Sequence, residues 1–227
     1  MNKATELFKD FPSKILYKYR TINSFTYQLL INSELYYSFP HQFNDPFDCF
    51  IKSRYEGDKN EWEKYLQKYP SNKQESILQF VKSKGFNAEL INKELPEDIR
   101  TNYNTAMMVY CFSEICDSIL MWAHYADIHK GICLGFNTFH FNDQDAFILM
   151  HEIISKDEIE PDRRIAPLSK VKYSKTLLEP YNGLKDSPSR ISEFLQTKYK
   201  CWGYEKEWRS MLKYEYEKQN MRFNKES

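Results

Sequence analysis

Two glutamates and an arginine alternate near the C-terminal end of the chain, at Glu205, Glu207 and Arg209. In a β-strand, side chains two residues apart share one face, so the three charges would lie side by side. Neighbouring carboxylates repel each other, which separates their pKa values and lets the pair serve as an acid and a base. A row of solvated charges on the surface of a sheet is the simpler interpretation of the triplet. Both interpretations depend on what packs against this strand.

A second group of side chains that could bind a ligand lies between Val109 and Phe136. The pattern predicts a strand over 109–112, a helix capped by Asp117 or Ser118, and another strand over 132–136. The buried stripe of this helix is expected to contain Ile119, Leu120, Trp122, Ala123 and Ala126. Ser113 at the strand end, together with Trp122, His124 and Tyr125, is a candidate ligand-binding set, because a strand end that meets an aromatic helix often forms a pocket. An ordinary core unit fits the same pattern equally well.

The turn around Asn44, Asp45 and Asp48 supplies a third set of polar groups. Asn and Asp before Pro46 favour a turn, and the turn could either be anchored by its phenylalanines or face a ligand. If this turn met the late strand in space, Asp45, Asp48, Glu205 and Glu207 could together hold magnesium for phosphodiester cleavage. A metal-dependent nuclease is therefore one alternative function.

Histidine and cysteine patterns give little support to a metal centre. His124 and His129 are five residues apart, a poor spacing for two ligands on one helical face. The five cysteines are Cys49, Cys111, Cys116, Cys133 and Cys201. Their odd number, without any C-x-x-C motif, predicts free thiols in a reducing cytoplasm. No metal is expected, and a nucleophilic cysteine paired with His124 has no supporting motif.

Composition narrows the classes of partner. The chain has 227 residues, with 32 Lys+Arg against 32 Asp+Glu, so the basic excess of a typical nucleic-acid-binding protein is absent. With only 6 glycines, neither glycine-rich phosphate-binding motif occurs. The N-terminal segment lacks the apolar core of a signal peptide, and no apolar run reaches the length of a membrane span. We expect a cytoplasmic protein without membrane contact.

The elements that would position these residues form a single α+β domain over 1–227. We expect strands over 15–20, 35–39, 109–112, 132–136, 146–154, 171–173 and 203–212. A charged, helix-favouring stretch over 56–106 is expected to be a helical insertion, and the polar tail over 215–227 to be frayed. A helix is expected over 189–200. The expected sheet is strongly bent, mixed or antiparallel, and split into two packed halves.

Six segments of the sequence resemble one family. They are LYKYR (Leu16 to Arg20), FNDPFD (Phe43 to Asp48), CFSE (Cys111 to Glu114), LMWAHYADIHKGICLGF (Leu120 to Phe136), VKYS (Val171 to Ser174) and YEKEWR (Tyr204 to Arg209). This ordered set resembles the bacterial family known as domain of unknown function 2971, over nearly the whole chain. The family name implies no activity.

The order of parts is also distantly similar to that of ADP-ribosyltransferases, whose fold binds NAD without a glycine-rich motif. That resemblance implies that Arg20 or Tyr19 on the first strand binds NAD, with Arg20 on its pyrophosphate. It implies that Ser113 with Tyr125 or Trp122 holds the nicotinamide. The late strand would carry the catalytic Glu207, with Glu205 as the second acid. This chain departs from the pattern because it has no clear first-strand histidine and no Ser-Thr-Ser run.

Taken together, the resemblance implies an NAD-using ADP-ribosyltransferase-like enzyme, as a bacterial toxin or anti-phage effector. The expected catalytic residues are Glu207 and Glu205. The expected residues for binding NAD or a related nucleotide are Tyr19, Arg20, Asn44, Asp45, Ser113, Trp122, His124, Tyr125 and Arg209. The acceptor, a protein or a nucleic acid, is not identified by the sequence. The alternatives are the nuclease and a non-enzymatic module that senses a nucleotide or a partner.

Overall fold

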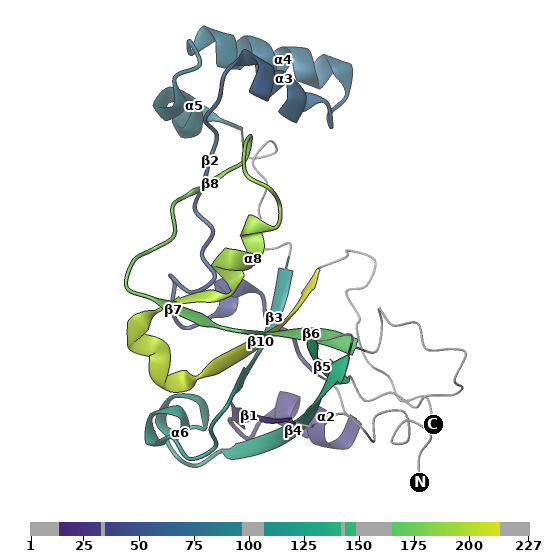
Figure 1. Ribbon diagram of the computed structural model, residues 1–227, viewed down its shortest axis with the longest axis vertical. Helices are drawn as coiled ribbons and strands as arrows, with labels where there is room; N and C mark the ends of the chain where they lie inside the picture. Colours follow the sequence, from purple (N-terminus) through teal and green to yellow (C-terminus); the bar gives the residue numbers. More distant parts are fainter. Residues whose placement is uncertain (1–13, 33–34, 97–106, 142–143, 149–164, 214–227) are drawn as a thin grey trace, which may run out of the picture.

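Six antiparallel strands form the body of the protein in a computed structural model (Figure 1). The structure describes residues 14–32, 35–96, 107–141, 144–148 and 165–213. The strands are β1 (Lys14–Arg20), β3 (Met107–Ser113), β4 (Ile132–Phe141), β5 (Gln144–Ile148), β6 (Ile165–Lys170) and β10 (Glu207–Lys213). They close into a barrel in the order β1-β3-β10-β6-β5-β4. The α+β class is confirmed, but the sheet that was expected to be split into two packed halves is a closed barrel.

The barrel is closed unevenly. β1 pairs with β4 along its whole length, from Lys14↔Thr138 to Arg20↔Ile132. In contrast, β1 pairs with β3 only through Tyr17↔Ser113. The two strands are therefore joined by one residue pair, and the rest of β1 follows β4. We call this junction the β1/β3 seam.

Alternation along the strands separates two faces. One face carries the apolar cluster of the barrel interior, whose buried members are Leu16, Tyr37, Tyr110, Phe112, Leu168 and Trp208. On the opposite face of β3 and β10, Met107 and Met211 pack against a second cluster around Cys49 and Phe194. The polar residues Glu207 and Arg209 share that second face, because they alternate with Trp208 on β10.

The remaining elements lie around this body. They are α2 (Ser24–Asn32), η1 (Pro40–Gln42), β2 (Ser53–Arg54), α3 (Lys59–Leu66), α4 (Ser71–Ser83), α5 (Ala88–Glu94), α6 (Ile119–Tyr125), β7 (Lys172–Ser174), β8 (Tyr181–Asn182), α8 (Arg190–Leu195), β9 (Thr197–Tyr199) and η3 (Lys200–Glu205). β2 with β8 and β7 with β9 form two small parallel sheets. Of the described helices, none is long and apolar enough to cross a membrane.

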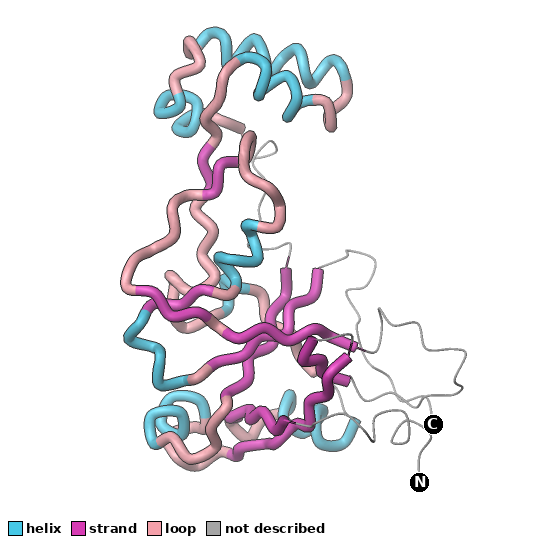
Figure 2. Tube along the Cα trace, viewed as in Figure 1, coloured by secondary structure: helices cyan, strands magenta, loops and turns pink. Residues whose placement is uncertain are grey.

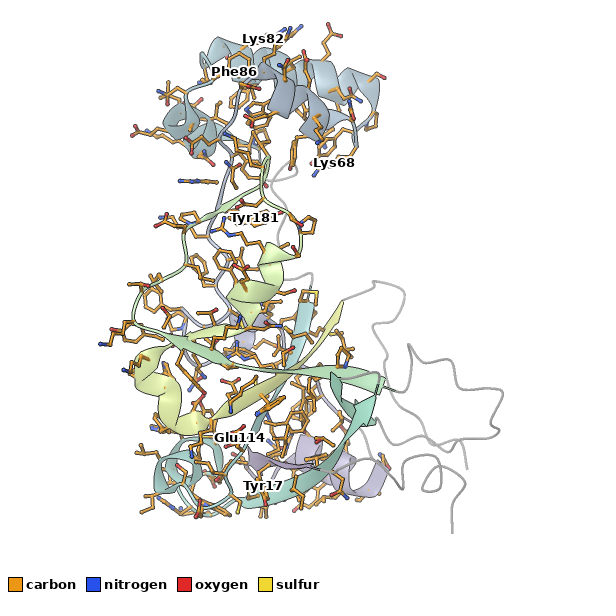
Figure 3. All side chains as sticks on the ribbon, viewed as in Figure 1. Tyr17, Lys68, Lys82, Phe86, Glu114 and Tyr181 are labelled. Carbon is orange, nitrogen blue, oxygen red and sulfur yellow. The ribbon has the colours of Figure 1, made fainter. Side chains whose placement is uncertain are left out.

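Helices α3, α4 and α5 stand away from the barrel at one end of the molecule (Figures 1 and 2). They have their own apolar core, in which Trp62 and Val81 are fully buried. Asp58 caps α3 by accepting a hydrogen bond from the Glu61 amide, and Asn87 caps α5 in the same way. Figure 3 shows Lys68, Lys82 and Phe86 on this helical arm, and Tyr181 on the segment that connects it to the body.

Helix α6 begins where expected, because the Ser118 side chain accepts a hydrogen bond from the Met121 amide. The expected buried stripe is wrong in part, since Ile119 is 75% exposed and Leu120 is 48% exposed. The residue that α6 buries is Met121, and Ala126 directly after the helix is also buried; both pack on Tyr19 of β1.

Three other expectations are corrected. Residues 35–39 make no strand, although Ser38 forms a single bridge with Val109. No element was expected between the strands over 146–154 and 171–173, but Ile165–Lys170 form β6. The expected helix over 189–200 ends at Leu195, and the next residues form β9 and the start of η3. Part of the expected strand over 146–154, and the tail over 215–227, lie outside the described residues.

Candidate active site

The two glutamates of the late segment lie on different elements. The expected single strand over 203–212 is wrong at its start, because Glu205 ends the 3-10 helix η3 and Glu207 begins β10. Between them, Lys206 adopts a left-handed conformation with φ of 45°. This turn, rather than strand alternation, brings both carboxylates to one point.

Both carboxylates contact the ammonium group of Lys198 on β9. Lys198 Nζ lies 2.5 Å from Glu205 Oε2, 3.0 Å from Glu207 Oε2 and 3.2 Å from Asp48 Oδ2. The Lys198 side chain is only 5% exposed. Burial alone would lower the pKa of Lys198, but the three carboxylates raise it well above its ordinary value, so this lysine stays charged.

Arg209 completes the group from the other side. Its Nη2 donates to both oxygens of Asp48, at 2.7 and 2.8 Å, and its Nε donates to Glu207 Oε1 at 2.7 Å. Its Nη1 donates to the Leu195 carbonyl at 2.7 Å and contacts Cys49 Sγ. Arg209 is 0% exposed. We call Asp48, Lys198, Glu205, Glu207 and Arg209 the charge cluster.

The interpretation of the triplet as a solvated row of charges is therefore wrong. Glu205 and Glu207 are 2% and 4% exposed, because the turn with Asp48 and the segment with Lys198 cover this face. Arg209 was expected to bind a nucleotide, but its contacts instead fix Asp48 to Glu207 inside the protein. Buried charges of this kind are retained only when they are paired.

The two glutamates differ in electrostatic environment. Burial raises the pKa of the Glu205 carboxyl, and the charge of Glu207 raises it further while Lys198 opposes the shift. Burial would also raise the pKa of Glu207, but Arg209 and Lys198 lower it well below its usual range. Three carboxylates face two cations, so a proton on Glu205 makes the cluster neutral. One glutamate is thus held ionised, and the other takes up a proton more readily.

Aromatic rings lie next to Glu205. The Tyr125 hydroxyl donates a 2.6 Å hydrogen bond to Glu205 Oε1. His124 lies 6.4 Å from Trp202 and 6.3 Å from Tyr204, measured between ring centroids. We call His124, Tyr125, Trp202 and Tyr204 the aromatic cluster. Its rings are half-buried or, for His124, exposed, so this cluster faces solvent beside a buried acid.

The Tyr125 hydroxyl is a poor acid in this position. Burial raises the pKa of Tyr125, and the charge of Glu205 raises it further. On the other side of the cluster, the Tyr173 hydroxyl accepts a hydrogen bond from the Glu207 amide at 2.8 Å. Burial is the largest cause that raises the pKa of Tyr173 to about 12. Both tyrosines therefore act as neutral hydrogen-bonding groups at neutral pH.

Other residues expected at the site have structural contacts. Ser113 Oγ donates to the Glu205 carbonyl at 2.7 Å, so it positions Glu205. The Tyr19 hydroxyl donates to the Ile115 carbonyl, and the Trp122 indole donates to the Cys116 carbonyl. Tyr19 and Trp122 pack edge to face, 5.4 Å apart. These contacts support the loop that leads into α6.

The polar residues of the turn over 43–48 point to different partners. Asp48 enters the charge cluster, whereas Asp45 accepts a hydrogen bond from the Phe47 amide within the turn. Asn44 lies close enough to Tyr125 for a hydrogen bond that counters the rise in its pKa. The structure therefore joins Asp48, Glu205 and Glu207, three of the four acids that the nuclease alternative requires, but around Lys198 and Arg209. Among the described residues, no group of three or more His, Cys, Asp or Glu is arranged to hold a metal ion.

Sequence reasoning missed several members of this site. Lys198 was placed in an expected helix, where a lysine is usually solvated, and Trp202 lies in no motif. Tyr204 opens the YEKEWR segment, but no role at the site was assigned to it. The only signal for Trp202 and Tyr204 was aromatic enrichment beside Glu205. The five cysteines are all free, with Cys49 buried against Arg209. Arg20 Nε donates to Thr26 Oγ1 at 3.0 Å.

Comparisons with known proteins give one match. Residues 121–210 match a family model described as "Protein of unknown function (DUF2971)". The matched segment begins in α6 and ends in β10, so it contains Tyr125 and all of the charge cluster except Asp48. This match supports the family resemblance. No curated protein and no solved structure matches, and the ADP-ribosyltransferase resemblance receives no support from these comparisons.

Proposed function

We propose that the chain is an ADP-ribosyltransferase-like enzyme that cleaves NAD, with Glu205 as its reacting carboxyl. The observation that carries the proposal is the position of Glu205, whose pKa is raised and whose Oε1 is held by Tyr125 beside an aromatic cluster. Buried acids with a shifted pKa and a specific partner concentrate at functional sites. The proposal is otherwise based on the order of motifs in the sequence.

The residues present suit a nucleotide with a flat ring. Trp202, Tyr204 and His124 offer partly exposed ring faces, which can stack on a planar heteroaromatic group. Tyr125 joins this cluster to Glu205 through its hydroxyl. NAD as substrate supplies a glycosidic carbon–nitrogen bond with nicotinamide as the leaving group. A carboxylate near that sugar would stabilise the positive charge that develops as the bond breaks.

Glu205 would then accept the proton of the incoming nucleophile, since a raised pKa makes its carboxylate a stronger base. Glu207 was expected to fill this role. Its contacts favour a positioning role instead, because both of its partners, Arg209 and Lys198, are cations that keep it ionised, whereas one partner of Glu205 is the neutral Tyr125 hydroxyl. By keeping Glu207 ionised, Arg209 keeps a negative charge beside Glu205 and so maintains the difference between the two acids.

The test follows nicotinamide release from NAD by the wild type, by Glu205→Gln and by the control Glu75→Gln. Glu75 is exposed on α4, in the helical arm. We expect the wild type and the control to release nicotinamide equally, and Glu205→Gln to lose about 100-fold or more in rate. Circular dichroism of each variant checks that the fold is intact.

Three results would contradict the proposal. Full activity of Glu205→Gln would remove the role of that carboxyl. Saturable binding of NAD without release, also in the presence of candidate protein and nucleic-acid acceptors, would favour the sensing module. Cleavage of a phosphodiester substrate that stops on chelation of magnesium would favour the nuclease. A role as a toxin or anti-phage effector in the bacterial cytoplasm stays a prediction.

A further inference from the structure

A pair of cysteines outside the charge cluster lies next to α6. Cys133 of β4 pairs with Tyr19 of β1, so their side chains lie on the same face of the sheet. Tyr19 belongs to the buried cluster that contains Met121 of α6, and Cys133 packs against this cluster. Trp122 packs there too, edge to face with Tyr19. Cys133 is therefore a half-buried thiol at the contact between the sheet and α6.

The second cysteine, Cys116, lies in the segment between β3 and α6, and this segment is bound to the same two aromatic rings. The Tyr19 hydroxyl donates to the Ile115 carbonyl at 2.8 Å and accepts from the Ser118 amide at 3.4 Å. The Trp122 indole donates to the carbonyl of Cys116 itself at 2.9 Å. Contacts on both sides of Cys116, and at its own carbonyl, therefore fix this residue beside the Tyr19 ring.

Tyr17 connects the two thiols. It pairs with Gly135, so it is a diagonal neighbour of Cys133 on the outer face of β1 and β4. Its hydroxyl lies close enough to Cys116 for a hydrogen bond, and the charge of Cys116 is the largest cause that raises the pKa of Tyr17. Burial is the largest cause that raises the pKa of Cys133 to about 11, and the charge of Cys116 adds to this rise. Figure 3 shows Tyr17 at the end of the molecule opposite the helical arm.

The other three cysteines have different surroundings. Cys49 is buried against Arg209, and Cys111 pairs with Arg209 across β3 and β10. Burial raises the pKa of both thiols, so they stay protonated and shielded from a dissolved oxidant. Cys201 is exposed on η3 and serves as a control for exposure alone. Cys116 combines exposure with a neighbouring half-buried thiol.

We infer that Cys116 and Cys133 form a reversible disulfide, which makes α6 respond to oxidants. A peroxide reacts first with the exposed Cys116, whose sulfur attacks one peroxide oxygen. The oxygen–oxygen bond breaks, and a sulfenic acid and one water form. The sulfur of Cys133 then attacks the sulfenic sulfur, so that the disulfide bond forms and a second water leaves. Each sulfur loses one electron, the peroxide is reduced to water, and exchange with a dithiol restores both thiols.

The disulfide would close a loop that contains the whole of α6, because Cys116 precedes this helix and Cys133 follows it. A closed loop has fewer unfolded conformations, so the helix opens less often. The inference does not depend on the proposed reaction. If that reaction is correct, the disulfide also restrains Tyr125, which holds Glu205, and this consequence alone rests on the proposed function.

Mass spectrometry of the full chain tests the link. The reduced protein is treated with hydrogen peroxide, unfolded, alkylated without reduction, and digested. Cleavage after Glu114 and Lys130 separates the peptides of Cys111, Cys116 and Cys133. In the wild type we expect one linked species, which joins the peptides of Cys116 and Cys133 and disappears when a dithiol is added.

The variants Cys116→Ser and Cys133→Ala should lack the linked species, whereas the control Cys201→Ser should form as much of it as the wild type. Because Cys116 is exposed, Cys116→Ser removes the link without disturbing the core, and circular dichroism checks each fold. Oxidation should slow hydrogen exchange in α6 of the wild type by about tenfold and leave Cys116→Ser unchanged.

Three outcomes would overturn the inference. The first is oxidation of Cys116 to the sulfinic acid without any link. The second is a link from Cys116 to a different cysteine or to a second copy of the chain. The third is unchanged exchange in α6 of the linked protein. None of these measurements uses NAD, so failure of the proposed reaction would leave the disulfide standing, and failure of the disulfide would leave the reaction standing.

Discussion

Glu205 and Glu207 are two residues apart, yet their surroundings shift the pKa values of their carboxyls in opposite directions. Glu207 accepts hydrogen bonds from Arg209 and Lys198, so its charged form is stabilised. Glu205 shares Lys198 but is otherwise bound by a neutral tyrosine, so burial dominates and its pKa rises. Substituting each by its neutral isostere should therefore have different consequences.

At pH 7 we expect Glu207→Gln to lower the free energy of unfolding by about 3 kcal/mol, because it removes one of the two buried carboxylates, Glu207 and Asp48, that pair with Arg209. Glu205→Gln should lower it by less than about 1 kcal/mol, because burial already favours a neutral group there. Urea-induced unfolding followed by tryptophan fluorescence measures both values. Equal losses in the two variants would contradict the assigned difference.

The pH dependence of stability has a defined sign. The pKa of Glu207 is lower in the folded state than the ordinary value of about 4.3, so its contribution is present above that pH and is lost as the pH falls. The pKa of Glu205 is raised, so its contribution is present below the ordinary value and is lost as the pH rises through the folded-state value. The stability of Glu205→Gln relative to the wild type should therefore increase with pH, in unfolding curves measured from about pH 4 to 8. A constant difference would contradict this.

At the scale of elements, the α6–β4 turn determines where Tyr125 and β1 meet. Asp127, Ile128 and His129 all have positive φ, at 48°, 52° and 66°. Gly131 follows, and a Cβ atom there would lie 2.2 Å from the Arg20 carbonyl oxygen. Glycine is thus needed because the backbone of the turn touches the end of β1.

Gly131→Ala should lower the free energy of unfolding by about 2 kcal/mol or more, because backbone rather than a flexible side chain must move. Gly203→Ala is the matched control, since a Cβ atom there lies 3.9 Å from the Tyr173 ring, an ordinary contact. Thermal unfolding of the two variants gives the comparison. If Gly131→Ala were as stable as Gly203→Ala, the close approach of the turn to β1 would be wrong.

At the scale of the whole molecule, the helical arm and the barrel have separate apolar cores. They are connected through the short parallel pair of β2 and β8 and the chain on either side of it (Figure 2). The arm therefore has few contacts that would transmit a local defect to the barrel. The expectation of a single domain over 1–227 stays a prediction.

Trp62→Ala tests this separation, because Trp62 is 0% exposed at the centre of the arm. We expect a loss of about 3–5 kcal/mol in the stability of the arm, with faster hydrogen exchange in α3, α4 and α5. Exchange in β3 and β10 should stay slow. Leu90→Ala, at a site on α5 that is 45% exposed, is the control and should change little. Faster exchange throughout the barrel would show that the two cores unfold together.

The sequence by itself determined the features that depend on local pattern. Alternation identified β1, and the helix-favouring composition of 56–106 agrees with α3, α4 and α5. Short polar side chains limited the cap of α6 to Asp117 or Ser118, and the structure has Ser118. The α+β class follows from these elements. The sequence also selected Glu205 and Glu207 as candidate site residues. It did so because both were expected on one strand, whereas Glu205 belongs to η3.

Only the tertiary structure decided which charges are buried and with which partners. Arg209 and Asp48 are separated by 161 residues in sequence, and no local pattern predicts that they form two hydrogen bonds. From the sequence, Lys198 would be taken for a solvated lysine, whereas in the structure three carboxylates surround it. The pKa shifts of Glu205 and Glu207 arise from burial and from charged partners, and both depend on contacts between distant segments.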